Sequence, residues 1–211
     1  MRTTLCACVL VAVATVFVAG QRATTPAPAP GRTPGTRVAT ATVCAANLGT
    51  GVKSRRTFCD AIIATTPKES VLVTIPAHTG AATLMFDVHN RFSLPVVAGQ
   101  PALAFARHEA VVAVIRPTGE VIGRAAVIRE FRTPADLFDQ IGGGGRAGGV
   151  KAVAPGPAEG ARLSIPAGVN AIGIVGVRLR ARSGMGADET FESPGRPVAI
   201  VSNVRVEYRP R

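Results

Sequence analysis

The sequence predicts an all-β protein: a single-domain antiparallel β-sandwich of the jelly-roll or immunoglobulin-like kind. Short apolar runs rich in valine and isoleucine recur along residues 38–211, and Gly, Pro, Asn or Thr separate them. One stretch, RPTGEV at 116–121, has the residues of a tight turn between two such runs. Many strands at this spacing are typical of sandwiches and jelly rolls.

The first 20 residues have the composition of a secretory signal peptide. Arg2 supplies a positive charge, residues 5–19 are an uncharged apolar run, and residues 18–20 (VAG) precede a cut before Gln21. The run is shorter than the roughly 20 apolar residues that a spanning helix needs. We therefore expect export, to the periplasm or outside the cell.

Residues 21–37 (QRATTPAPAPGRTPGTR) are dominated by proline, threonine and glycine and show no apolar periodicity. This composition predicts a disordered, extended linker. Residues 38–211 remain, which is enough chain for one domain with a proper core.

The chain that remains after the predicted cut holds two cysteines, Cys44 and Cys59. An even pair in an oxidising compartment predicts a disulfide, with two buried thiols as the alternative. The bond would close a loop of about 15 residues and stabilise by roughly 3 kcal/mol in the chain-entropy model. Neither a CxxC spacing nor a nearby histidine supports a metal site at these cysteines.

We expect eight strands and one short helix. The helix is predicted at 133–141 (TPADLFDQI), because Thr133 suits an N-cap and Pro134 the first helical position. The Gly-, Ala- and Pro-rich segment 142–160 is expected to be a long flexible loop. The predicted strands are 58–64, 70–75, 81–89, 102–115, 120–131, 161–165, 171–182 and 198–208.

A faint internal repeat aligns residues 73–88 (VTIPAHTGAATLMFDV) with residues 163–177 (LSIPAGVNAIGIVGV). Each copy has a hydroxyl residue, then Ile-Pro-Ala, a short turn and a new strand, and the proline ends the first strand because it lacks an N–H. The pattern resembles the strand–turn–strand edges of bacterial extracellular jelly-roll and immunoglobulin-like modules. The resemblance implies a secreted β-sandwich and implies no catalytic residues.

Two of the three histidines lie near one predicted strand, and they raise the question of a metal site. Asp87 and His89 share one face of that strand. His78 lies at a turn, so in a hairpin it would be far from His89. Asp87, His89 and His108 would make three ligands with an open position, as in catalytic zinc sites, if their strands are neighbours. The sequence favours the alternative, an ordinary solvated sheet face.

Other enzyme signatures are missing from the sequence. We find no GxSxG, HExxH or Walker motif, and the thirteen acidic residues are scattered. Asp188, Glu189 and Glu192 gather in DETFES and could bind calcium, although an exposed acidic turn is favoured. We therefore predict a protein that is not an enzyme and has no cofactor, with calcium or zinc as the alternatives.

The net charge is +11, and lysine occurs at only three positions, so arginine supplies most of the positive charge. Codon use in a GC-rich genome is one explanation. The placement of the arginines suggests another, because guanidinium groups bind phosphate, sulfate and carboxylate. Two strands each carry arginines on one face. The set is Arg178, Arg180 and Arg182, opposite Val175, Val177, Leu179 and Ala181, together with Arg205 and Arg209 beside Glu207.

The chain has no tryptophan and one tyrosine, which argues against base stacking and specific nucleic-acid recognition. We expect a non-enzymatic binding or structural module of the cell envelope or extracellular space. Its expected partner is an anionic polysaccharide, lipopolysaccharide or another envelope protein. One alternative is a metal-binding module or metal-dependent hydrolase using Asp87, His89 and His108. The other is a self-assembling or adhesive envelope protein that pairs through a sheet edge.

Overall fold

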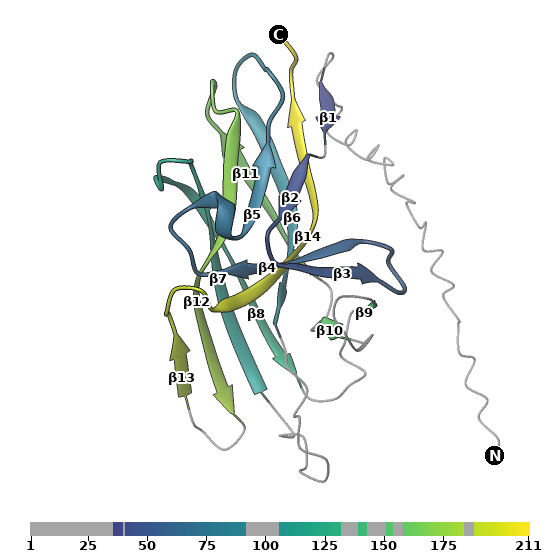
Figure 1. Cartoon of the computed structure of the whole chain (residues 1–211), viewed down its shortest axis with the longest axis vertical. Helices are drawn as coiled ribbons and strands as arrows, with labels where there is room; N and C mark the ends of the chain where they lie inside the picture. Colours follow the sequence, from purple (N-terminus) through teal and green to yellow (C-terminus); the bar gives the residue numbers. More distant parts are fainter. Residues whose placement is uncertain are drawn as a thin grey trace, which may run out of the picture. The chain divides into compact units, whose positions relative to one another are not determined.

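The computed structural model describes residues 36–39, 41–91, 106–131, 139–142, 151–153, 158–183 and 188–211. All of them belong to one compact unit, Thr33–Arg211. They form two antiparallel sheets packed against each other (Figure 1), which confirms the predicted all-β sandwich. The predicted signal peptide and most of the predicted linker lie outside these residues, although Arg37 already belongs to a strand.

The first sheet has the strand order β10-β9-β3-β4-β14-β6-β11, and β1 pairs with β14 beside this path. Its long central strands, β14 and β6, pair with each other and carry much of the core. The strands are β1 (Arg37–Ala39), β3 (Asn47–Gly51), β4 (Thr57–Ile62), β6 (Ala82–Asn90), β9 (Asp139–Gly142), β10 (Lys151–Val153), β11 (Glu159–Ile165) and β14 (Pro197–Tyr208).

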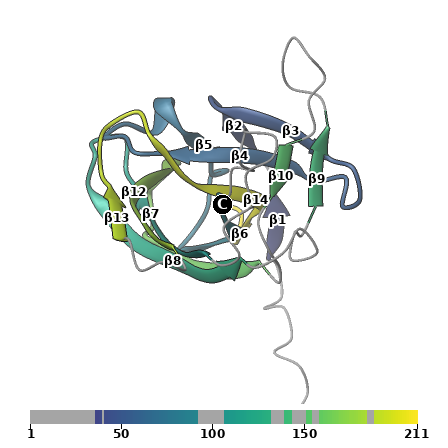
Figure 2. The same ribbon diagram turned by 90° about the horizontal axis from the view of Figure 1, so that it is seen from below.

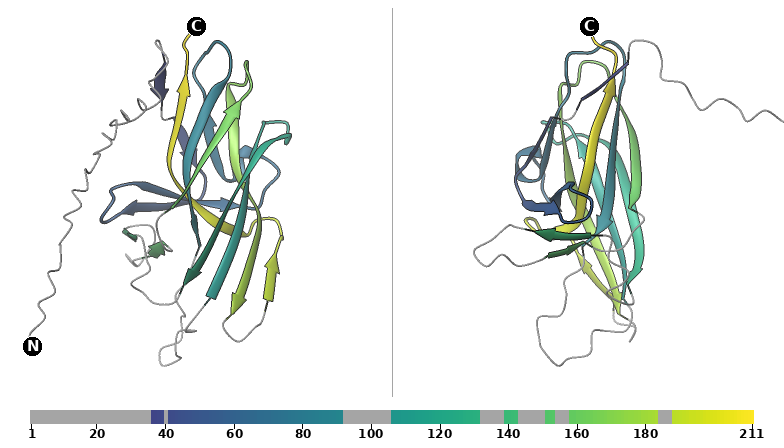
Figure 3. Two further views of the ribbon diagram at one scale, coloured as in Figure 1. Left: turned by 180° about the vertical axis from the view of Figure 1, so that it is seen from behind. Right: turned by 90° about the vertical axis from the view of Figure 1, so that its right-hand side faces the viewer.

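The second sheet has the order β2-β5-β12-β7-β8, and β13 pairs with β12. Figure 2 shows β13, β12, β7 and β8 following one another along a curved layer, and Figure 3 shows the same strands from behind. A 3-10 turn, η1 (Pro67–Glu69), precedes β5. The strands are β2 (Thr42–Cys44), β5 (Val71–Thr74), β7 (Ala106–Ile115), β8 (Val121–Phe131), β12 (Ala171–Ser183) and β13 (Asp188–Phe191).

All eight predicted strands are present, within a few residues of their predicted ends. The predicted turn at 116–121 joins β7 to β8. The N–H of Arg116 donates to the carbonyl oxygen of Glu120 at 2.8 Å, and Gly119 takes a φ of +89° that favours glycine. The short strands β1, β2, β3, β9, β10 and β13 were not predicted.

Two apolar clusters lie on opposite faces of the first sheet. The main core fills the space between the sheets and includes Leu84, Phe86 and Val88 from alternate positions of β6. A smaller cluster lies on the outer face of the first sheet. Its members are Leu48, Phe58, Ile141 and Ile200.

Each copy of the internal repeat crosses from one sheet to the other. Residues 73–88 run from β5 in the second sheet to β6 in the first, and residues 163–177 run from β11 in the first to β12 in the second. The two copies pair strand for strand, β5 with β12 and β6 with β11. Ile75 and Ile165 are buried directly before the prolines. The segment around His78 is therefore an arch between sheets, not a hairpin turn.

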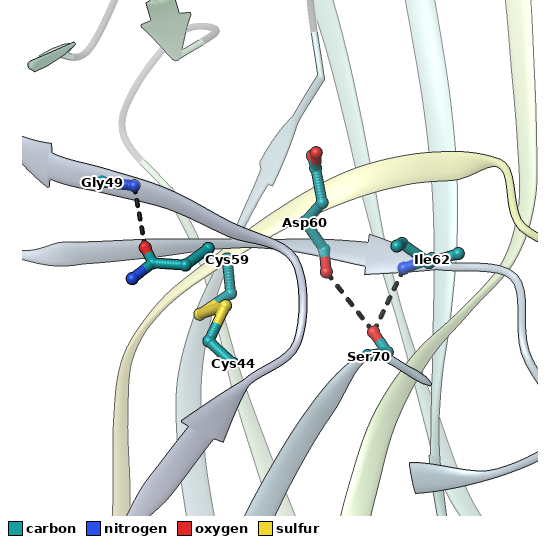
Figure 4. The surroundings of a disulfide bond; sticks show 7 residues. Cys44, Gly49, Cys59, Asp60, Ile62 and Ser70 are labelled. Atoms are coloured by element: carbon teal, nitrogen blue, oxygen red, sulfur yellow. Dashed lines mark hydrogen bonds between the residues drawn. A yellow bond between two sulfur atoms is a disulfide. The ribbon is translucent and has the colours of Figure 1, made fainter. Parts of the chain in front are cut away.

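The two sheets are joined covalently, as the cysteine pair predicted. A disulfide links Cys44 in β2 to Cys59 in β4, and their Cα atoms are 5.9 Å apart (Figure 4). Ser70, just before β5, adds a polar link to the same strand. Its Oγ accepts the N–H of Ile62 at 3.1 Å and donates to the carbonyl oxygen of Asp60 at 3.4 Å. β4 is thus fixed to the edge of the second sheet at two points.

The predicted helix is wrong at its C-terminal end. Asp139 and the two residues after it belong to β9, while residues 133–138 lie outside the described part of the chain. Two contacts favour a strand over a helix here. Ile141 packs in the cluster on the outer face of the first sheet. The Asp139 carboxylate accepts hydrogen bonds from the backbone N–H groups of Lys53, Ser54 and Gln140. Burial alone would raise the pKa of Asp139, but a hydrogen bond from the Ser54 side chain and those from the three N–H groups lower it to about 2.

The predicted long loop is also interrupted. Gly142 ends β9, Lys151–Val153 form β10, and Glu159 already begins β11.

Candidate functional site

A β-bulge in β12 places the row of arginines on the outer face of the second sheet. The register of β12 on β7 shifts between Gly176 and Arg178, so the alternation of side chains changes phase at Val177. Before the bulge Ile172 and Ile174 face the core, and after it Leu179 does. The bulge therefore keeps apolar residues inside on both halves of the strand while the arginines point outward.

The bulge also corrects part of the sequence prediction. Val175 and Val177 were expected on the same face as Leu179, opposite the arginines. Instead they pack with Ala113 and Ile115 in a small cluster on the outer face. The predicted shared face of Arg178, Arg180 and Arg182 is present, and all three side chains are exposed.

Two of the three arginines are held by one carboxylate from the neighbouring strand β13. Arg182 donates to Asp188 from Nε at 2.7 Å and from Nη2 at 2.9 Å, and Arg180 Nη2 donates to it at 3.0 Å. These hydrogen bonds, from Arg182 first, hold the pKa of Asp188 well below its usual range. The repulsion expected along a row of like charges is thus partly relieved within the sheet.

β7 adds a fourth arginine to the row. Arg107 lies opposite Arg182 in the register, and Glu109 lies opposite Arg180. Arg107 Nη2 is 3.2 Å from Glu109 Oε1, while its buried Nε has no hydrogen-bond partner among the described residues. We call Arg107, Arg178, Arg180 and Arg182 the arginine face.

A hollow of about 130 Å³ lies within the arginine face, lined by Arg107, Glu109, Arg180 and Arg182. At about 30 Å³ per water molecule it has room for roughly four waters, or for one small anionic group. Among the described side chains, four guanidinium groups face the carboxylates of Glu109 and Asp188, and the register of β8 on β7 also places Glu130 opposite Arg107. The face therefore keeps a positive excess, and it offers planar donors in the arrangement that carboxylate, sulfate and phosphate accept.

The other two predicted arginines do not belong to this face. Arg205 and Arg209 come from β14 and the residue after its end, in the first sheet, and both are exposed. Glu207 between them is 3.4 Å from Arg162 Nη2. The five arginines of the sequence prediction therefore divide between two sheets, because strands 171–182 and 198–208 do not pair with each other.

The structure does not bring Asp87, His89 and His108 together. Asp87 and His89 lie on the outer side of β6 in the first sheet. His108 lies on β7 in the second sheet, on the core-facing side that it shares with Ala110, and burial lowers its pKa. No group of three His, Cys, Asp or Glu side chains that could hold a metal ion occurs within the described ranges.

Asp87 and His89 instead make separate polar contacts with neighbouring strands of the first sheet, part-buried at Asp87 and buried at His89. Arg56 Nη1 and Asn203 Nδ2 donate to Asp87 Oδ2 at 2.8 and 3.0 Å. His89 Nε2 lies 2.9 Å from Ser202 Oγ, and its ring packs edge-on against Phe58 with 5.6 Å between centroids. Sequence analysis placed Asp87 and His89 on one face, but their partners lie up to 116 residues away, and no local pattern identifies them.

The acidic residues of DETFES lie on β13 and directly after it. Asp188 binds the arginines as described, and Glu189 and Glu192 are exposed. His78, the remaining histidine, is buried in the arch between β5 and β6, where its Nδ1–H donates to the carbonyl oxygen of Pro76 at 2.9 Å. Neither feature forms a metal site in the described part of the chain.

Comparisons with protein-family models, with curated proteins and with solved structures find no match for this chain. Within the described residues, no helix has the length and apolar character needed to cross a membrane.

Proposed function

We propose that this protein is an exported, non-enzymatic binding module of the cell envelope or extracellular space, and that its arginine face binds anionic polymers. The observation that carries the proposal is the row of exposed arginines on β12, two of which line a hollow with Arg107, and which with Arg107 outnumber the described carboxylates beside them. Sulfated or uronic-acid polysaccharides and lipopolysaccharide offer such anionic groups at repeated spacings. The disulfide and the composition of residues 1–20 support export.

Binding of dextran sulfate across a salt series, with uncharged dextran as the control polymer, tests this proposal. Affinity should fall steeply with salt, because bound arginines displace counterions. The triple variant Arg178→Gln, Arg180→Gln, Arg182→Gln should bind about tenfold more weakly or worse.

A matched control removes the same charge from the other sheet: Arg162→Gln, Arg205→Gln, Arg209→Gln. It should retain most of the affinity. Equal losses in both triple variants would show that net charge alone drives binding. No binding of the wild-type protein at low salt would reject the proposal outright.

A single substitution at Asp188 gives a further test of the arginine face. Asp188→Asn keeps the size of the side chain but removes the carboxylate that holds Arg180 and Arg182, so dextran sulfate should bind more tightly. Glu189→Gln, one residue away on the same strand, makes the same change in net charge without touching that pair. An equal gain in the two variants would contradict a specific role for the arginine face.

A further inference from the structure

A second candidate site lies where β4 separates from β14 in the first sheet. β14 pairs with β4 as far as Ser202, and it pairs with β1 only from Val206 onward. Asn203–Arg205 lie between these two partners, and the register of β14 on β6 also shifts there. A pocket of about 380 Å³ occupies this position, which is within the size range of small-molecule sites.

The wall of this pocket is mostly apolar. It includes the Cys44–Cys59 disulfide, Val201 and Val204, and both valines belong to the main core. Thr42 from β2 also lines the pocket, and its buried Oγ1 has no hydrogen-bond partner in the described part of the chain. A buried hydroxyl without a partner is costly, and rotation of the Thr42 side chain toward a ligand oxygen would satisfy it.

Two arginines are among the residues that line the pocket, and one of them has no carboxylate partner among the described residues. Arg56 and Arg205 both line the pocket, and none of the lining residues is Asp or Glu. Arg56 already binds Asp87, behind the pocket. Arg205 is exposed and makes no ion pair with the described residues, so its guanidinium is available to an incoming anion.

The backbone around the pocket is held in an uncommon conformation. Among the described residues, only Arg55 and Asn203 are non-glycine residues with positive φ, at +59° and +55°. Asn203 lines the pocket and Arg55 adjoins Arg56, which also lines it. The network in which Arg56 and Asn203 both bind Asp87 fixes these two segments together. Local strain that is held by surrounding contacts is typical of preorganised binding sites.

We propose that this pocket binds a small amphiphile, an apolar chain that ends in a carboxylate. The disulfide and the valines would cover the chain, while Arg205 and the Thr42 hydroxyl would bind the carboxylate. The site is separate from the arginine face, because it lies between β2 and the strands β4 and β14 and shares no residue with that face.

Calorimetric titration of the full-length mature chain with decanoate tests the proposal. Decanoate should bind saturably, butyrate should bind much more weakly because it lacks the chain, and decyltrimethylammonium should not compete because its charge is reversed. Arg205→Gln should weaken decanoate binding about tenfold, which corresponds to the loss of a charge-assisted hydrogen bond. Thr42→Val, which keeps the shape of the side chain, should weaken it severalfold.

Arg209→Gln is the matched control, since Arg209 directly follows the strand that carries Arg205 but does not line this pocket. It should leave decanoate binding unchanged, as should the triple variant of the arginine face. Equal weakening by Arg205→Gln and Arg209→Gln, or no saturable binding of decanoate, would overturn the proposal. Thermal melting of each variant confirms that it is folded, which is expected because Arg205 and Arg209 are exposed.

Discussion

At the scale of single residues, the surroundings of His89 determine its pKa. Its side chain is completely buried beside Phe58 and within hydrogen-bond distance of Ser202. Charging this imidazole would place a cation in a poorly solvated site, so burial lowers its pKa to about 4, although the nearby Asp87 carboxylate acts in the opposite direction. His89 is therefore neutral at pH 7 and belongs to the packing of the outer cluster.

Stability should consequently fall in mild acid. Between about pH 6.5 and about pH 4 the unfolded chain binds a proton at His89 that the folded chain does not, so the free energy of unfolding decreases as pH falls. The expected loss is about 3 kcal/mol, complete near pH 4. Urea unfolding at several pH values measures it. In His89→Gln the decrease over this range should be smaller, and an identical decrease in both proteins would contradict the assignment.

At the scale of elements, the bulge in β12 is the feature on which the arginine face depends. Gly176 lies at this point, opposite Val112, and bridges to Ile63 at the end of β4. A Cβ on Gly176 would lie 2.5 Å from Val198 Cγ2 and 2.7 Å from the carbonyl oxygen of Ala61. The glycine thus allows the two sheets to approach closely where the strand changes phase.

Gly176→Ala should lower the free energy of unfolding by about 1–3 kcal/mol, as expected for overpacking against backbone. Gly160→Ala in β11 is the control, because a Cβ there meets nothing within 4 Å. It should have little effect. Chemical denaturation of the two variants compares them, and equal stabilities would show that the close approach at Gly176 carries no cost.

The longer strands could be predicted because their apolar patterns extend over several residues, as in β6 and β14. β1, β2 and β13 have three or four residues each, too few to display a period. The sequence did contain a sign of the bulge: Ile172 and Ile174 are even-numbered, whereas Leu179 is odd. Strict alternation along the strand predicts the wrong face for Val175 and Val177. The helix prediction was wrong at its C-terminal end because hydrogen bonds from Lys53 and Ser54, far away in the sequence, hold Asp139 in a strand.

At the scale of the whole molecule, side-chain links join the two sheets at several places in the described part of the chain, and the hydrogen bonds of Ser70 to β4 are one of them. The disulfide ties β2 to β4, and on β8 Arg129 Nη2 reaches Glu159 Oε2 of β11 at 2.9 Å. The disulfide could be predicted from the even pair of cysteines, whereas the ion pair depends on which strands lie at the edges of the two sheets. For the same reason the sequence could not show that Arg178 and Arg205 lie on different sheets.

Removing the disulfide with Cys44→Ser and Cys59→Ser together should lower the free energy of unfolding by roughly 3 kcal/mol, because the bond closes a loop of 15 residues in the unfolded chain. Urea unfolding of the double variant and of the wild-type protein gives this difference. Wild-type protein treated with a reductant should behave like the variant. Unchanged stability in the variant would show that the hydrogen bonds of Ser70 and the core are sufficient to hold β4.

The central claim is that one face of the second sheet binds anionic polymers, and arginine footprinting tests it most directly. Bound dextran sulfate should protect Arg178, Arg180 and Arg182 from phenylglyoxal, as read by mass spectrometry. Arg178 is the clearest reporter, since it is exposed and has no ion pair among the described residues. Arg205 and Arg209 on the first sheet should react as they do in the free protein. Protection of all five arginines alike, or of the first-sheet pair alone, would contradict the claim.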